Sequence, residues 1–347
     1  MRWAVIMAGG KGKRFWPLSR ENNPKQFIKI KGNETLLDLS YKRAKLISDK
    51  ILIVTTQNLK GKMNYEADFI IEPFGKNTAV VCLLSALYIL KKDANPLIAV
   101  LPADHWIENL EEFKKSFEAA YKIAERKYLV TFGIKPIRVE TGYGHIEISK
   151  LLDEIGGVKV YEVLKFHEKP DYETAQYYTQ SGRYFWNSGM FVWRADYIIE
   201  NFAKYKSDMY KILSQYDFKD EVIPSEIYDK IEDISVDYAI MEKAERVAMI
   251  ESKFFWEDLG SFTSLERVLP VDSDKNVKIG DTYLENVKNS VIIAKDGLVA
   301  VYGLEDIIVV HTDDVTLVLP KKDAQKVKKI YDNIVKERYD PKYYKGS

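Results

Sequence analysis

The sequence predicts an α/β protein with a mostly parallel, doubly wound sheet, followed by a small β-rich domain. Strand-like and helix-like segments alternate over residues 1–270, and several of the strand-like runs are apolar without alternation. Continuous apolar runs are expected of strands that helices cover on both faces. The pattern becomes β-rich after Pro270. We therefore predict one domain at residues 1–270 and a second at residues 271–347.

The first domain contains both kinds of element in regular order. Strands are predicted at Trp3–Met7, Ile51–Thr55, Phe69–Ile71, Leu97–Leu101, Leu129–Phe132, His145–Ser149, Val158–Phe166, Gly189–Trp193 and Val247–Glu251. Helices are predicted at Thr35–Leu46, Thr78–Leu90 and Leu110–Ala124, with Asn33 and Asn77 in the positions of N-caps. In such sheets ligands bind beyond the carboxyl ends of the strands, so residues at those ends are candidates for a site.

The second domain contains five short β-rich pieces between residues 282 and 320: TYLENV, SVIIAK, GLVAVY, DIIVVH and VTLVLP. They fit a small β-domain or a short stack of β-helix coils. Asp323–Glu337 is predicted to be a terminal helix and Tyr339–Ser347 a frayed tail. The basic residues of this region are expected to form a solvated face: Lys321, Lys322, Lys326, Lys328 and Lys329.

Composition excludes several classes of function. The 347 residues carry 52 basic and 52 acidic side chains, so no overall charge attracts the chain to nucleic acid or to a membrane. No apolar run is long enough for a membrane span, and no signal peptide is evident, so we expect a cytoplasmic protein. Cys82, the only cysteine, is expected to be a buried apolar residue, and the four histidines lack zinc-site spacing.

The stretch AGGKGKRFWPLSR, directly after the first strand, places three glycines among basic residues. Without a Cβ, such a backbone can turn its N–H groups toward phosphate oxygens. Neither the Walker A spacing nor the dinucleotide fingerprint fits, since Phe15 stands where the latter needs its third glycine. Arg14 and Lys25 are placed to neutralise a polyphosphate, whereas Lys11 and Lys13 could equally be solvated. The alternative is a tight turn with solvated lysines.

Together with PKQF, this stretch resembles the signature of sugar-1-phosphate nucleotidyltransferases, and within them it is most similar to mannose-1-phosphate guanylyltransferases. The resemblance continues through EPFGKNTAVV, VLPADH, TGYGHI, FHEKP, WNSGMF and FFWEDLGSF, to about residue 265. It implies a Rossmann-like, doubly wound mixed sheet, GTP and mannose 1-phosphate as substrates, and Mg²⁺ as cofactor. Larger bacterial relatives carry a further isomerase domain, which we do not expect in this chain.

The implied reaction joins a sugar phosphate oxygen to the α-phosphorus of a nucleotide. A phosphate monoester has a second pKa of about 6, so no general base is needed, and neutralising the two anions is the main task. We expect Arg14 to bind the β- and γ-phosphates and Lys25 to lie near the reacting centre, in line with the family's basic catalytic residues. The backbone of Gly9, Gly10 and Gly12 would surround the nucleotide.

Two aspartates are candidate Mg²⁺ ligands. Asp104 ends an apolar strand, and Asp258 lies in WEDLG. Mg²⁺ prefers one or two carboxylates together with phosphate oxygens. The alternatives are an N-cap for Asp104 and a turn aspartate for Asp258. The neighbouring Glu257 should point elsewhere if the segment is extended.

Two further groups of residues are assigned to the base and the sugar. Guanine offers two adjacent donors, so a carboxylate suits it, and Glu72 is the candidate unless it is a surface charge. Asn77 could assist or only cap its helix. Sugar-phosphate candidates are Gly144, Glu168, Lys169 and Asn187. Glu168 and Lys169 could instead be a solvated pair, and packing is the expected role of Tyr143, Trp186 and Trp256.

Rival readings remain open. The same chemistry could serve another hexose 1-phosphate, such as glucose 1-phosphate, or another nucleotide. An NAD(P)-dependent oxidoreductase is disfavoured by the missing third glycine, and an inactive sensor by the presence of both cations and both aspartates. Because short exposed strands need cover, we expect a homodimer.

Overall fold

The computed structural model describes residues 1–10 and 12–346. Internal contacts divide the chain into two compact units. The first unit comprises Met1–Gly9, Ser40–Ala103 and Ile107–Trp256. The second comprises Gly10–Leu39, Asp104–Trp106 and Glu257–Ser347. Each unit is therefore assembled from segments that are far apart in the sequence.

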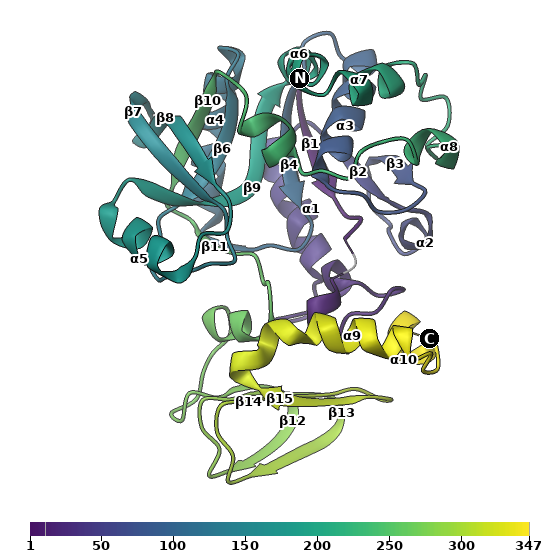
Figure 1. Ribbon diagram of the computed structural model, residues 1–347, viewed down its shortest axis with the longest axis vertical. Helices are drawn as coiled ribbons and strands as arrows, with labels where there is room; N and C mark the ends of the chain where they lie inside the picture. Colours follow the sequence, from purple (N-terminus) through teal and green to yellow (C-terminus); the bar gives the residue numbers. More distant parts are fainter. Residues whose placement is uncertain (11, 347) are drawn as a thin grey trace. The chain divides into compact units, whose positions relative to one another are not determined.

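A nine-stranded sheet forms the first unit, in the order β3-β2-β1-β4-β9-β6-β10-β8-β7 (Figure 1). The strands are β1 (Arg2–Met7), β2 (Lys50–Thr56), β3 (Asp68–Glu72), β4 (Leu97–Pro102), β6 (Leu129–Ile134), β7 (His145–Ile155), β8 (Val158–His167), β9 (Tyr184–Arg194) and β10 (Val247–Ser252). All nine predicted strands are present. Parallel pairing is confined to β1–β4 and to β6 with β10, so the sheet is mixed rather than mostly parallel. Strands buried on both faces have the same apolar pattern in either direction, which is why the sequence did not distinguish them.

Helices cover the sheet of the first unit: α2 (Gln57–Lys60), α3 (Thr78–Lys92), α4 (Leu110–Glu125), α5 (Tyr172–Ser181), α6 (Ala195–Tyr205), α7 (Ser207–Ser214), α8 (Ser225–Tyr228) and the π-helical turn η3 (Asp237–Met241). Helix α3 packs against α6 and α7 (Figure 1). The Asn77 side chain accepts a hydrogen bond from the Thr78 N–H, which confirms the predicted cap.

The predicted cap at Asn33 is wrong. Helix α1 (Leu36–Ile47) begins three residues later, where the Thr35 hydroxyl accepts from the Asp38 N–H and the Asp38 carboxylate accepts from the Thr35 N–H. This reciprocal pair satisfies two N–H groups at the helix start, so it fixes the boundary more strongly than a single asparagine would.

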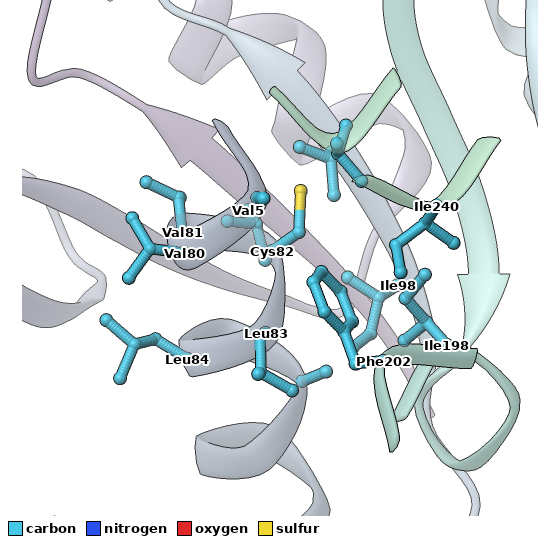
Figure 2. Packing of buried hydrophobic residues seen from close by; sticks show 14 of the residues in the cluster. Val5, Val80, Val81, Cys82, Leu83, Leu84, Ile98, Ile198, Phe202 and Ile240 are labelled. Carbon is cyan, nitrogen blue, oxygen red and sulfur yellow. The ribbon is translucent and has the colours of Figure 1, made fainter. Parts of the chain in front are cut away.

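The main core of the first unit lies between the sheet and α3 (Figure 2). Val5 and Ile98 of the sheet, Leu83 of α3 and Phe202 of α6 meet there, each almost fully buried. Cys82 is buried among them, as predicted. Burying a side chain of this size contributes about 1.5–3 kcal/mol, so this layer stabilises the packing of the sheet against α3.

The second unit contains a four-stranded sheet of β12 (Val277–Glu285), β13 (Val291–Tyr302), β14 (Ile307–His311) and β15 (Thr316–Pro320). The first three strands are parallel neighbours joined by short turns, which is the arrangement of β-helix coils, and β15 closes the sheet in the antiparallel direction. The predicted pieces SVIIAK and GLVAVY form one long strand, β13.

Short helices complete the second unit: η1 (Lys13–Phe15), η2 (Lys25–Phe27), η4 (Phe262–Arg267), η5 (Lys321–Lys326), α9 (Val327–Lys336) and α10 (Lys342–Lys345). A separate pair of strands, β5 (Trp106–Glu108) and β11 (Phe255–Glu257), lies where the chain passes from one unit to the other. None of the described helices is long and apolar enough to cross a membrane.

The prediction of a frayed tail is wrong for the described residues. The Trp16 indole N–H donates to the Tyr343 carbonyl (2.7 Å), and the Glu21 N–H donates to the Tyr344 carbonyl (3.0 Å). The tail therefore supplies acceptors to the segment that follows the glycine-rich loop. Backbone carbonyls carry no sequence signal, so composition alone could not reveal this role.

Candidate phosphate, base and sugar sites

Gly12 gives the glycine-rich loop its path. Its φ of 60° lies in the left-handed region, and a Cβ there would stand 2.4 Å from the Lys25 Cβ. The backbone at Gly12 therefore runs directly against Lys25, which a larger residue would displace. Gly10 has open space around it. Lys11 lies outside the described residues.

Within the second unit, a cavity of about 350 Å³ opens beside this loop. Its lining includes Gly12, Arg14, Lys25, Asp104, Asp258 and Lys328. The structure thus brings together both predicted cations and both predicted metal ligands, although they come from distant parts of the sequence. Such a mixture of unlike charges around one cavity is suited to a polyphosphate with a divalent cation.

Lys25 is the most buried charge at this cavity, with 6% of its surface exposed. Its ammonium group donates to Asp104 Oδ2 (2.9 Å) and to the Asp258 carbonyl (2.5 Å). Burial alone would raise the pKa of Asp104, but Lys25 and His105 outweigh it and hold that pKa below its ordinary value. Asp104 is therefore ionised at neutral pH. The N-cap alternative is wrong for Asp104, because the cap of α4 is Asn109.

Asp258 has the contact expected of a turn aspartate, since its Oδ1 accepts from the Gly260 N–H (2.8 Å). The residue is also among those that line the cavity. Glu257 points elsewhere, as predicted: it is 1% exposed and accepts two hydrogen bonds from Arg267 (2.6 and 2.7 Å). Metal binding by Asp104 and Asp258 stays a prediction. No cluster of three or more acidic, histidine or cysteine side chains able to hold a metal occurs among the described residues.

The basic residues around the cavity differ in their partners. Lys13 forms an ion pair with Asp332 (2.8 Å), whereas Arg14 and Lys328 form none within the part of the chain that the structure describes. The prediction of a solvated lysine face is confirmed at four exposed lysines: Lys322, Lys326, Lys328 and Lys329. It is wrong at Lys321, which has 16% of its side chain exposed and pairs with Glu266 (2.5 Å). Lys328 also lines the cavity.

Glu72 lies in the first unit and is buried, with 1% exposed, so the surface alternative is wrong. The Tyr228 hydroxyl donates to its Oε1, and a Cβ at Gly9 would stand 2.8 Å from its Oε2. Burial raises the pKa of Glu72 to about 7, although the hydrogen bond from Tyr228 acts in the opposite direction. The carboxyl group is thus held directly under the first glycine of the loop and titrates near neutrality.

The segment from Tyr228 to Asp237 organises the loop after Glu72. Lys76 donates to the carbonyls of Tyr228 (2.6 Å) and Ile231, and the Asn77 N–H donates to Asp233 Oδ1 (3.0 Å). Asn77 itself is occupied as a cap, so a contact with a nucleotide stays a prediction. No sequence signal pointed to this segment, because its contacts are made largely by backbone atoms.

Three of the sugar candidates lie together in the first unit. The Asn187 N–H donates to the Gly144 carbonyl (2.8 Å), and a Cβ at Gly144 would stand 2.6 Å from Glu168 Oε2. The Asn187 amide also donates to Asp237 Oδ1 (2.7 Å), while its oxygen accepts from Thr131 (3.1 Å). Gly144 therefore leaves the space in which the Glu168 carboxylate sits.

Asp237 is the residue that sequence reasoning missed. Burial raises its pKa to about 6, even though Asn187 donates to it. An aspartate at the start of a helical turn is common, so SVDYAIME alone carries no functional signal. The Lys169 side chain is more exposed than that of Glu168, with which it forms an ion pair (3.2 Å). Its present contacts are therefore those of the solvated pair that was the alternative prediction.

The aromatic residues of this region pack as predicted. The Tyr143 ring makes edge contacts with Trp186 (5.4 Å between centroids) and with Trp256 (5.1 Å). Edge-to-face pairs of this kind add about 0.5–1.5 kcal/mol beyond burial. They support the TGYGHI turn, and through it the position of Gly144.

Comparison with known proteins gives consistent matches. Residues 3–275 match the family described as Nucleotidyl transferase, and residues 285–334 match the MannoseP isomerase/GMP-like beta-helix domain. A mannose-1-phosphate guanylyltransferase of Salmonella montevideo is 40% identical over 95% of this chain and 73% of its own length. Mannose-1-phosphate guanylyltransferase 2 of Escherichia coli O157:H7 is 37% identical over 95% of this chain and 72% of its own length. A crystal structure described as mannose-1-phosphate geranyltransferase from Thermus thermophilus is 31% identical, with a TM-score of 0.88 over 96% of this chain and 99% of that one.

Proposed function

Because this chain belongs to the mannose-1-phosphate guanylyltransferases, nucleotidyltransferases that make GDP-mannose, we propose a mechanism for its residues. An oxygen of mannose 1-phosphate attacks the α-phosphorus of GTP in line, and the bond from that phosphorus to the β-phosphate breaks. The products are GDP-mannose and pyrophosphate. The observation that carries the proposal is the cavity shared by Arg14, Lys25, Asp104 and Asp258.

Charge neutralisation is the main contribution of this cavity. At neutral pH the sugar phosphate is already largely a dianion, since its second pKa is about 6, and it needs no general base. Lys25 lies next to both aspartates and would stabilise the charge that develops at the α-phosphorus. Arg14 would bind the β- and γ-phosphates, and the backbone of Gly9, Gly10 and Gly12 would surround the nucleotide.

The donor set also fits Mg²⁺, since Asp104 and Asp258 bring two hard carboxylates to one cavity. These side chains would hold the ion, which when bound supplies neutralisation of phosphate charge. We expect Asp104→Asn and Asp258→Asn to fold normally and to lose turnover by orders of magnitude. Titration with Mn²⁺ should show weaker binding in both variants, and unchanged turnover in both would remove the assignment.

The nucleobase is assigned to Glu72. The N1–H and exocyclic amino group of guanine are adjacent donors that an ionised carboxylate can accept together. The Tyr228 hydroxyl, which donates to Glu72 Oε1, would fix the orientation of this carboxylate. Asn77 would assist from the start of α3.

Mannose 1-phosphate is assigned to the group around Asn187. Glu168 and Asp237 are acceptors for sugar hydroxyls, and Asn187 can both donate and accept. The backbone of Gly144 allows a close approach of the hexose, and Lys169 would reach the sugar phosphate by leaving its present partner Glu168. The contacts among Gly144, Glu168, Asn187 and Asp237 support this grouping.

The proposal extends to the organisation of the chain. We take residues 1–270 as the catalytic domain and residues 271–347 as the smaller domain, although the compact units group Gly10–Leu39 with Glu257–Ser347. The reaction would take place in the cytoplasm on small-molecule substrates, without nucleic acid or membrane, in a homodimer.

Release of pyrophosphate is the decisive assay. GTP with mannose 1-phosphate should give rapid release, whereas ATP, UTP or dTTP with the same sugar should not. Glucose 1-phosphate with GTP tests the rival sugar. An enzyme that releases no pyrophosphate with any sugar phosphate would exclude the catalytic mechanism.

A further inference from the structure

Lys328, the second residue of α9, lines the same cavity as Arg14, Lys25, Asp104 and Asp258. We propose that Lys328 binds the β- and γ-phosphates of GTP, and hence the departing pyrophosphate. The C-terminal helix would then be part of the nucleotide site. This inference rests on the function proposed above.

Helix α9 is held against the segment around the glycine-rich loop by specific contacts. Tyr331 is 3% exposed, and its hydroxyl donates to Glu21 (3.1 Å). Asp332 pairs with Lys13, the residue next to Arg14. Residues four apart lie on the same side of a helix, so the contact of Asp332 also directs Lys328 toward the loop. Its place at the cavity is therefore fixed by the helix.

The charges around the cavity leave a role for Lys328. Lys25 is bound to Asp104 and Lys13 to Asp332, whereas Lys328, like Arg14, forms no ion pair with any described residue. A triphosphate brings several negative charges that these cations can neutralise. Lys328 and the adjacent Lys329 are both exposed on α9, but only Lys328 is among the residues that line the cavity.

The bond changes in the reaction predict which KM values depend on Lys328. As the sugar phosphate oxygen bonds to the α-phosphorus, the bond to the β-phosphate breaks and negative charge moves onto the leaving pyrophosphate. A lysine at this end should affect GTP in the forward reaction and pyrophosphate in the reverse reaction. Mannose 1-phosphate and GDP-mannose lack the two phosphates that leave, so their binding should change little.

The test compares Lys328→Gln with Lys329→Gln, in both directions of the reaction. We expect Lys328→Gln to raise KM for GTP and for pyrophosphate about tenfold, a typical loss for one charge-assisted hydrogen bond. KM for mannose 1-phosphate and for GDP-mannose should stay within about twofold, as should the constants of Lys329→Gln. Lys328→Arg, which keeps the charge, should recover most of the loss.

Several results would overturn the proposal. KM values for GTP and pyrophosphate that are unchanged in Lys328→Gln would contradict it. Changes of the same size in Lys329→Gln would contradict it as well. A uniform rise of all four constants with a lower Tm would show a structural role instead. If the wild type makes no GDP-mannose, the proposed function fails on its own. Calorimetric titration with pyrophosphate then still decides whether Lys328 binds this anion.

Discussion

At the scale of single residues, Glu72 should make GTP binding depend on pH. Burial raises its pKa from 4.5 to about 7, so the group is mostly protonated below pH 7 and ionised above it. Only the ionised form accepts both donors of guanine. KM for GTP should therefore rise as the pH falls from 8 to 6, approaching tenfold per unit below the pKa. Steady-state kinetics across this range measures the effect.

The matched variant is Glu72→Gln. It cannot titrate, so its KM for GTP should be high at every pH and should lose the step near pH 7. Inosine triphosphate, which lacks the exocyclic amino group of guanine, provides a second control. Its phosphates titrate like those of GTP, so this comparison separates the titration of the phosphates from that of Glu72. Equal pH profiles for the wild type and Glu72→Gln would contradict the assignment of the base.

Gly12 and Gly61 form a matched pair for a second prediction. A methyl group at Gly12 would meet the Lys25 backbone N at 2.8 Å and its Cβ at 2.4 Å, and φ is 60°, so Gly12→Ala must displace Lys25 or the loop. A catalytic cation that moves by about 1 Å can cost a hundredfold in rate, and we expect a loss of that order in kcat. Gly61→Ala, which also has nothing within 4 Å of the added atom and lies outside the proposed nucleotide site, should keep most activity. Similar kcat values for both variants would argue against Lys25 at the reacting centre.

At the scale of elements, the C-terminal tail should stabilise the glycine-rich segment. Arg20 is 8% exposed and donates to the carbonyls of Lys342 (2.9 Å) and Tyr343 (2.6 Å), and it also binds Asp314 (2.6 Å). A variant ending at Asp340 would remove these carbonyls, and that of Tyr343 is also the acceptor of Trp16. Losing these three part-buried hydrogen bonds should reduce the free energy of unfolding by about 2–4 kcal/mol.

Chemical denaturation measures this loss, and KM for GTP should rise with it because the loop is less well held. Lys345→Ala keeps the backbone and tests whether the side chain matters; it should behave like the wild type. If the shortened variant has wild-type stability, the tail contacts contribute nothing measurable.

Elements with a distinct pattern of apolar residues could be predicted from the sequence. Contacts made by backbone atoms could not. The apolar runs predicted all nine strands of the first unit, and the strand ends led to Glu72 and Asp104. The antiparallel direction of β9 depends on strand pairing and was not predicted. The cap at Thr35 depends on local hydrogen bonds and was wrongly predicted at Asn33. Asp237 became visible only through its contact with Asn187.

At the scale of the whole molecule, one surface of the C-terminal sheet exposes several large apolar side chains. Tyr283, Leu298 and Tyr302 are 57%, 67% and 69% exposed. In the parallel register of β12 and β13, Asp281 lies opposite Leu298 and Glu285 opposite Tyr302, so all three apolar side chains point to the same face. Clustered exposed apolar residues of this kind usually mark an interaction surface.

We expect a second copy of the chain to cover this face and give a homodimer. Light scattering at micromolar concentration should give twice the monomer mass of 40.2 kDa. Leu298→Glu with Tyr302→Glu should shift the mass toward the monomer, because placing two charges in an apolar interface is costly. Glu substitutions at Tyr172 and Tyr177, equally exposed on α5, are the control and should leave the dimer intact. A wild-type protein of monomer mass would mean that this face has another role or none.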